Sequence, residues 1–234
     1  MAMPSFSSTS RPAHNAVTTL SSTGLERSLA QATLRRVEAR EFVFAEGDPT
    51  THVYRVETGA VALYKVLTDG RRQVMGFACA GDLVGLGAQD EHAMNAQAIK
   101  PTRLRCLSVS ALRRFADHDP TVGYKLYEAM ARELAQTRDL MLTTGQRSAI
   151  ERVASFLLAF ARRNERSGQD NADIELPMTR ADIGDFLGLT IETVSRTFTK
   201  LKMMGMIELP QSNRVKLLDV DELRRVANGG EAAS

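Results

Sequence analysis

The sequence has no tryptophan, only two cysteines and no long apolar run. Two cysteines, Cys79 and Cys106, are too few for a disulfide scaffold or for a four-thiolate metal site within one chain. No apolar stretch approaches the roughly 18 residues that a membrane span needs. The N-terminus also lacks the basic start and apolar stretch of a secretory signal. We therefore expect a cytoplasmic protein with no part in the membrane.

Charge of one sign and enzyme motifs are also scarce. The formal net charge is only +2, so bulk electrostatics do not by themselves indicate a nucleic-acid binder. No nucleophile–base pair, metal-ligand spacing or glycine-rich phosphate loop is present, which argues against an enzyme. The histidines are dispersed along the chain, and we expect no metal or haem site on them. Because free cysteine is among the most buried residue types, we expect Cys79 and Cys106 to be structural rather than redox-active.

What is present is enough for two domains: 234 residues, of which 43% are hydrophobic. Residues 1–24 contain ten Ser or Thr and one charged side chain, Arg11, so we expect a mobile tail with a short helix beginning near residues 24–26. We divide the rest into a β-rich domain at 25–120, a long helix at 121–146 and a helical C-terminal domain at 147–234.

The β-rich domain shows short strand-like runs separated by turn signals. The runs are 41–45, 53–56, 60–66 and 73–77, and the turn formers include Glu57–Gly59, Asp69–Gly70 and Ala80–Asp82. The Asp69–Gly70 pair is typical of a hairpin, because both residues tolerate a positive φ. Turn signals at this spacing predict an antiparallel sandwich or barrel rather than βαβ units.

Two helices are predicted next, a short one at 109–119 that ends at Asp119–Pro120 and a long one at about 121–144. Side chains on the long helix recur at spacings of 3 and 4: Tyr127, Met130, Leu134, Thr137, Met141 and Thr144. Such a stripe is typical of a coiled-coil seam between two copies of the chain. The alternative is a stripe that packs on the core of the protein's own domain.

A helix-turn-helix is predicted between residues 179 and 201. Thr179 with Asp182 resembles a capping box, Gly188 ends the first helix, and Thr190 caps the second. Gly184 is small where two helices would cross closely. The buried sides would be Ile183, Phe186 and Leu187 on the first helix and Ile191, Val194, Phe198 and Leu201 on the second. A polar loop at 164–173 and a hairpin of 206–209 with 215–218 complete the domain.

The other face of the second helix carries Glu192, Ser195, Arg196 and Thr199, which share one side. A carboxylate accepts from the amino group of cytosine, and arginine binds guanine through two hydrogen bonds in the major groove. The candidates for phosphate contacts are Thr179, Thr190, Thr193, Thr199, Lys200 and Lys202. The alternative is a solvated face with a weak Glu192–Arg196 pair.

These motifs resemble the CRP/FNR family of bacterial transcription regulators over about residues 40–227. The glycines Gly47, Gly59, Gly81 and Gly85, with the segment Gly81–Gly85, resemble the family's cyclic-nucleotide-binding-type β-roll. The segment from Asp182 to Arg196 resembles its winged helix-turn-helix, and Glu192, Ser195 and Arg196 match the Glu-x-x-Ser-Arg signature of the FNR and FixK branches.

The resemblance implies an α+β fold with an N-terminal antiparallel β-roll, a long dimerisation helix and a C-terminal winged helix-turn-helix. It implies a homodimeric activator that binds double-stranded DNA at a TTGA-type palindrome. It also implies contacts with RNA polymerase, for which the loops 68–72 and 168–173 are candidates.

The sequence departs from the sensing members of the family. Those that bind cyclic AMP have a Glu after the second Gly of Gly-Asp-x-x-Gly and an Arg-Ser pair later, whereas here Leu86 follows Gly85 and the later stretch reads Glu91–Asn95. No cysteine precedes Cys79, which excludes the iron–sulfur cluster of FNR. We therefore expect no cofactor. The alternative is a sensor of the same fold that responds to haem or another small molecule.

Overall fold

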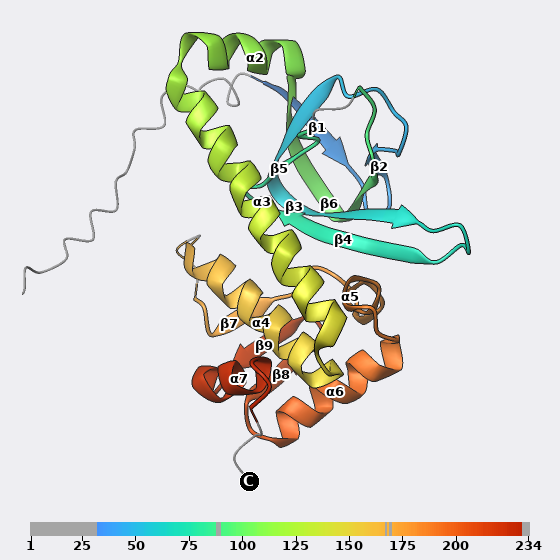
Figure 1. Ribbon diagram of the computed structural model, residues 1–234, viewed down its shortest axis with the longest axis vertical. Helices are drawn as coiled ribbons and strands as arrows, with labels where there is room; N and C mark the ends of the chain where they lie inside the picture. Colours follow the sequence, from blue (N-terminus) through green and yellow to red (C-terminus); the bar gives the residue numbers. More distant parts are fainter. Residues whose placement is uncertain (1–31, 88–89, 167, 169, 231–234) are drawn as a thin grey trace, which may run out of the picture.

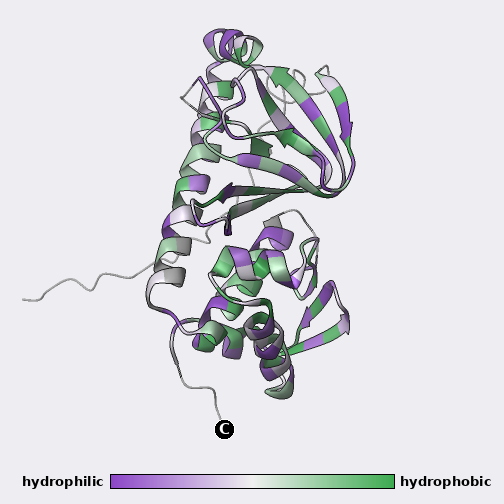
Figure 2. Ribbon diagram, turned by 90° about the vertical axis from the view of Figure 1, so that its right-hand side faces the viewer, coloured by the Kyte–Doolittle hydropathy of each residue, from purple (hydrophilic) through white to green (hydrophobic). Residues whose placement is uncertain are grey.

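The computed structural model describes residues 32–87, 90–166, 168 and 170–230. The tail predicted at 1–24 and the short helix expected near 24–26 lie outside these residues. Two lobes are stacked along the long axis of the molecule, and one long helix, α3, runs beside both of them (Figures 1 and 2). None of the described helices is long and apolar enough to cross a membrane.

The N-terminal lobe is an antiparallel sheet of six strands that closes around its own core, as the turn spacing predicted. The strands are β1 (Thr33–Val37), β2 (Phe42–Phe44), β3 (His52–Val66), β4 (Arg72–Cys79), β5 (Leu83–Val84) and β6 (Asn95–Ser108). Their order is β1-β6-β3-β4, with β2 paired to β6 and β5 paired to β3. Val56, Val61 and Leu104 are completely buried between them.

The prediction of two separate strands at 53–56 and 60–66 is wrong. They form one strand of 15 residues, β3, and the shifts in its pairing with β6 fall between Val56 and Val61. Gly59 has a φ of +94°, and a Cβ there would lie 2.3 Å from the hydroxyl oxygen of Thr102 and 2.6 Å from its Cα. This glycine therefore marks an irregularity where two strands approach closely, and not the end of a strand.

Three helices follow the sheet: α2 (Val109–His118), α3 (Pro120–Gln146) and α4 (Ala149–Arg166). The predicted break at Asp119–Pro120 is confirmed. Asp119 ends α2, its side chain accepts from the amide of Thr121, and Pro120 occupies the first turn of α3, where a missing amide hydrogen costs nothing. The predicted loop at 164–173 is shorter than expected, because α4 continues to Arg166.

The C-terminal lobe is built by α4 with α5 (Arg180–Leu187), α6 (Ile191–Met203), α7 (Val220–Ala227) and the strands β7 (Asp173–Glu175), β8 (Ile207–Gln211) and β9 (Arg214–Leu217). The predicted hairpin is confirmed as β8 and β9, but β7 adds a third strand on β9. Neither β7 nor α7 was predicted. Large buried side chains such as Leu157, Phe198 and Leu223 fill the space between the helices and this sheet.

Aromatic side chains pack the two lobes against each other. The ring of Phe77 on β4 lies 5.4 Å from that of Phe186 on α5, and Phe186 lies 5.9 Å from Phe156 on α4, measured between centroids. The C-terminal lobe therefore rests on the edge strand β4 of the sheet, at the start of its helix-turn-helix.

Candidate nucleic-acid interface

The first helix of the motif, α5, begins at the predicted capping box. The hydroxyl oxygen of Thr179 accepts from the amide of Asp182 at 3.1 Å, and the Asp182 carboxylate accepts from the amide of Thr179 at 3.0 Å. These two bonds satisfy amide groups that the first turn of a helix leaves without partners. Gly188 ends α5 with a left-handed φ of +65°, as predicted.

The turn between α5 and α6 is closed by a tight backbone contact. A Cβ on Gly184 would lie 2.6 Å from the carbonyl oxygen of Leu189, closer than real Cβ atoms come. The amide of Leu189 donates to the carbonyl of Gly184 at 3.0 Å. The prediction that a small residue is needed at Gly184 is confirmed, but the close approach is to the backbone of the turn and not to the second helix. Only glycine fits this position without moving the turn.

The second helix, α6, starts at Thr190, whose hydroxyl accepts from the amide of Thr193 at 3.2 Å. Its buried side carries Val194, Phe198 and Leu201, as predicted. The fourth predicted member, Ile191, is 46% exposed, because it occupies the first position of the helix. Thr197 is buried instead, and its hydroxyl donates to the carbonyl of Thr193 at 2.7 Å.

Arg180 holds the two helices together in a way that the sequence did not indicate. Its guanidinium lies 3.4 Å from the centroid of the Phe198 ring, an attractive cation–π contact between α5 and α6. Burial lowers the pKa of Arg180 to about 10. The only available signal was its position after the N-cap, which gives no information about a residue on the next helix.

The three predicted base-contacting side chains, Glu192, Ser195 and Arg196, lie on the exposed face of α6, and the phosphate candidate Thr199 lies on the same face. The hydroxyl of Ser195 donates to the carbonyl of Ile191, and that of Thr199 to the carbonyl of Ser195, so both stay close to their own helix. A hollow of about 600 Å³ beside this face is lined by Ser195, Arg196, Thr199, Lys200, Met203 and Met204. Hydrogen bonds from its own amide and from Thr190 lower the pKa of Glu192, so this carboxylate is ionised at neutral pH.

The candidates for phosphate contacts divide into two groups. Thr179 and Thr190 are N-caps, and the hydroxyl of Thr193 lies 3.0 Å from that of Thr190, so these three are partly engaged within the motif. Lys200 and Lys202 are exposed in the last turn of α6. Their ammonium groups are therefore accessible to phosphates.

The chain matches known protein families over both lobes. Residues 34–119 match a family described as "Cyclic nucleotide-binding domain", and residues 151–226 match one described as "Crp-like helix-turn-helix domain". The nitrogen fixation regulation protein FixK of Bradyrhizobium diazoefficiens is 42% identical over 187 residues, which are 80% of this chain and 78% of FixK. The chain belongs to the CRP/FNR family.

Other members of the CRP/FNR family agree with this assignment. The transcriptional activatory protein AadR of Rhodopseudomonas palustris is 39% identical over 79% of this chain and 77% of AadR. The structure of FixK2 from Bradyrhizobium japonicum superposes with a TM-score of 0.77 at 39% identity, covering 87% of this chain and 99% of FixK2. The predicted fold and the predicted FNR/FixK-like branch are confirmed. This CRP/FNR protein is a DNA-binding transcription regulator and not an enzyme.

The residues of the β-roll do not fit a cyclic nucleotide, the ligand after which its matched family is named. Leu86, in the position of the expected glutamate, packs on an apolar cluster that contains Val53 and Leu107. His92 is 8% exposed, and its ring stacks on Phe44 with centroids 3.6 Å apart. Residues 86–94 contain no arginine or lysine to bind a phosphate.

Two further predictions concern side chains away from α6. Tyr127, Met130, Leu134 and Met141 on α3 are each more than half exposed, so this stripe does not pack on the protein's own core. Thr137 is exposed as well, while the side chain of Thr144 lies outside the described residues. Cys79 and Cys106 are half-buried rather than fully buried, and burial raises the pKa of both thiols, which disfavours the reactive thiolate.

Proposed function

We propose that the protein is a homodimeric transcription activator that binds a TTGA-type palindrome through α6, without a cyclic nucleotide or an iron–sulfur cluster. The observation that supports this most strongly is the exposed face of α6. It presents an ionised carboxylate, Glu192, and a guanidinium, Arg196, one helical turn apart on a helix held rigidly by its caps and by Phe198.

In the proposed complex each side chain of this face has a distinct role. The fork of Arg196 binds the O6 and N7 acceptors of a guanine, and Glu192 accepts from the amino group of a cytosine. Ser195 and Thr199 line the hollow beside Arg196. Lys200 and Lys202 approach phosphates, together with the threonines at the helix starts, and so set the position of α6 on the DNA without discriminating between sequences.

The proposed dimer forms along the exposed stripe of α3. Its members recur at coiled-coil spacing: Tyr127, Met130, Leu134, Thr137 and Met141. All but Thr137 are large hydrophobic side chains that are exposed in a single chain. A two-fold axis along this seam would present two copies of α6 to successive major grooves about 34 Å apart, which requires a palindromic site.

As an activator, the protein would act in the cytoplasm, where bacterial DNA lies, and would contact RNA polymerase. At the tip of the β3–β4 hairpin, Asp69 and Arg71 form an ion pair, and both side chains are exposed to a partner. The loop 168–173, the second candidate, is described only in part.

The test is a competition assay at fixed salt over single-base variants of a TTGA–TCAA palindrome. Arg196→Ala should cost about 1–3 kcal/mol per half-site, a loss of roughly 5- to 150-fold, and should relax the preference at one guanine. Glu192→Ala should lose discrimination at a cytosine while non-specific affinity is kept or raised, since an acid near DNA is removed. Lys202→Ala should lower the affinity for all DNA sequences about equally.

Two matched control variants remove the same kinds of charged side chain from positions outside α6. Arg224 on α7 and Glu208 on β8 are exposed, and their alanine variants should keep the base preferences of the wild type. Unchanged preferences in Arg196→Ala and Glu192→Ala would show that α6 does not contact the bases.

A further inference from the structure

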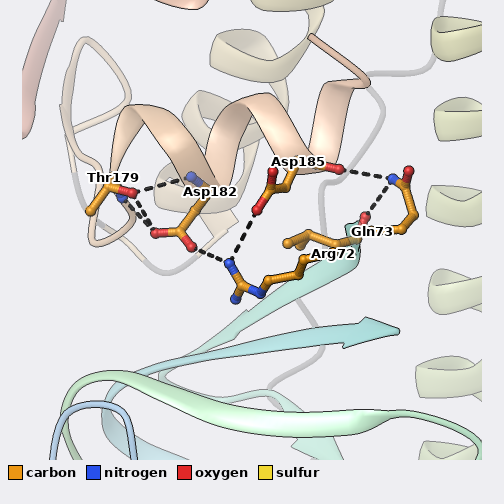
Figure 3. A network of polar contacts seen from close by, with 6 residues as sticks. Arg72, Gln73, Thr179, Asp182 and Asp185 are labelled. Carbon is orange, nitrogen blue, oxygen red and sulfur yellow. Dashed lines mark hydrogen bonds and ion pairs between the residues drawn. The ribbon is translucent and has the colours of Figure 1, made fainter. Parts of the chain in front are cut away.

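A network of polar contacts ties the β-roll to the start of the helix-turn-helix (Figure 3). Nη1 of Arg72, the first residue of β4, lies 2.6 Å from Oδ1 of Asp182 and 3.4 Å from Oδ2 of Asp185, both on α5. The side-chain amide of Gln73 donates to the backbone carbonyl of Asp185 at 2.8 Å. We call these four residues the interlobe latch.

The latch is held firmly on both sides. The Arg72 guanidinium lies 4.3 Å from the centroid of the Tyr64 ring, and its side chain is only 28% exposed, against 14% for Asp182. Water therefore screens this ion pair less than it screens a pair on an open surface. Burial raises the pKa of Asp182, but hydrogen bonds from Arg72 and Thr179 outweigh that effect and keep the pKa below its usual range.

The same carboxylate serves the latch and the cap of α5. Oδ1 of Asp182 binds Arg72, while Oδ2 accepts from the amide of Thr179 at 3.0 Å and from its hydroxyl at 2.7 Å. A cation from the β-roll is thus linked through one side chain to the first turn of the helix-turn-helix. From there the tight contact between Gly184 and Leu189 transmits the position of α5 to α6.

Two residues connect α3 to the C-terminal lobe. The chain passes from α3 to α4 through Arg147 and Ser148, and Arg147 is extended with φ −97° and ψ 145°. Among the described residues, two other ion pairs cross between the lobes, Arg163 with Asp82 at 2.5 Å and Lys100 with Glu175 at 3.0 Å. The latch differs from these two pairs because its contacts are made to α5, within the helix-turn-helix.

We propose that Arg72 is a positioning residue for DNA binding: the latch fixes the orientation of α5, and with it α6, relative to the dimerisation helix. This inference rests on the proposed function, because the orientation matters only if two copies of α6 must meet two half-sites at a set spacing. The latch does not mask the binding surface, since it holds α5 while the base-contacting face of α6 stays exposed.

Loss of the latch weakens binding for two physical reasons that act in the same direction. Without the latch, the helix-turn-helix samples other orientations relative to the β-roll. The apparent affinity for DNA then falls with the fraction of molecules that are competent to bind. Removing Arg72 also leaves Asp182 and Asp185 without their cation near a polyanion. The first effect is specific to a palindrome, whereas the second applies to any DNA.

The experiment compares a full palindrome with a single half-site, using the full chain and fluorescence anisotropy. Arg72→Ala should bind the palindrome about tenfold more weakly than the wild type. Its loss of affinity for the single half-site should be smaller. Arg71→Ala is the matched control for this assay, which contains no RNA polymerase: it removes the same charge one residue away, from a side chain that is 77% exposed and pairs with Asp69. Its affinity should stay within about twofold of the wild type.

Two further variants separate the latch from a general loss of folding or charge. Arg72→Lys keeps the charge and should recover part of the palindrome affinity. In the Asp182→Asn background, where the cap keeps an acceptor oxygen, Arg72→Ala should have much less effect than in the wild type, because the two residues act as one unit.

Several results would overturn the inference. One is an equal loss of affinity in Arg71→Ala and Arg72→Ala, and another is an equal loss of affinity for the palindrome and the half-site. The others are an undiminished effect of Arg72→Ala in the Asp182→Asn background, or tighter DNA binding by Arg72→Ala. If the wild type itself fails to bind the palindrome, the proposed function fails and this inference with it. If the wild type binds and Arg72→Ala binds equally well, only this inference fails.

Discussion

Gly184→Ala is the substitution whose effect follows most directly from the geometry of the helix-turn-helix. The added Cβ would lie 2.6 Å from the carbonyl oxygen of Leu189, so that oxygen must retreat by about 0.8 Å to reach an ordinary contact of 3.4 Å. The same residue donates its amide to the carbonyl of Gly184 at 3.0 Å. The turn therefore cannot move without straining the hydrogen bond that closes it.

The magnitude is a difference between opposing effects. Overpacking costs about 1–3 kcal/mol, and a weakened hydrogen bond about 1 kcal/mol. Alanine in place of glycine within a helix stabilises the folded protein by about 1 kcal/mol. We expect the free energy of unfolding of the C-terminal lobe to fall by about 1–3 kcal/mol, which lowers Tm by roughly 4–8 °C for each kcal/mol in a domain of this size. DNA affinity should fall as well, since α6 is displaced with the turn.

Calorimetry and circular dichroism measure the thermal unfolding, and anisotropy on the palindrome measures binding. Gly145→Ala is the control, because this glycine is exposed in helix α3 and a Cβ there meets nothing within 4 Å. It should be neutral or stabilising by up to about 1 kcal/mol. A Gly184→Ala protein as stable as Gly145→Ala, with wild-type affinity, would refute the argument from the tight turn.

Two other predictions concern the dimer and the β-roll. Leu134→Glu should shift sedimentation towards the monomer, because a carboxylate without a partner in a seam costs several kcal/mol. Ala135→Glu adds the same carboxylate at the next exposed position, off the stripe, and should leave the dimer intact; an intact Leu134→Glu dimer would show that the seam lies elsewhere. Burial lowers the pKa of His92, so the unfolded chain binds more protons and stability should decline as pH falls below about 6.5. Urea denaturation at pH 7.5 and pH 5.5 should show this decline in the wild type and a smaller one in His92→Phe; equal pH dependence would contradict it.

Much of the helix-turn-helix could be predicted from the sequence, because its signals are local. A capping box links Thr179 and Asp182 within one turn, and Gly188 reverses the chain at a single residue. The exposed face of α6 follows from helical periodicity in the same way. These features depend on groups within four residues of one another, so neighbouring side chains and backbone dictate them wherever the lobe is placed.

Features that depend on distant partners could be decided only by the tertiary structure. Glu57–Gly59 has the composition of a turn, yet β3 continues through it because β6 pairs with residues on both sides of it, from His52 to Tyr64. Ile191 is more apolar than Thr197, but the core lies on the side of Thr197. Arg72 and Asp182 are 110 residues apart, and no local pattern connects them. Propensity and periodicity describe one segment at a time, whereas pairing, burial and charge contacts arise only when segments meet.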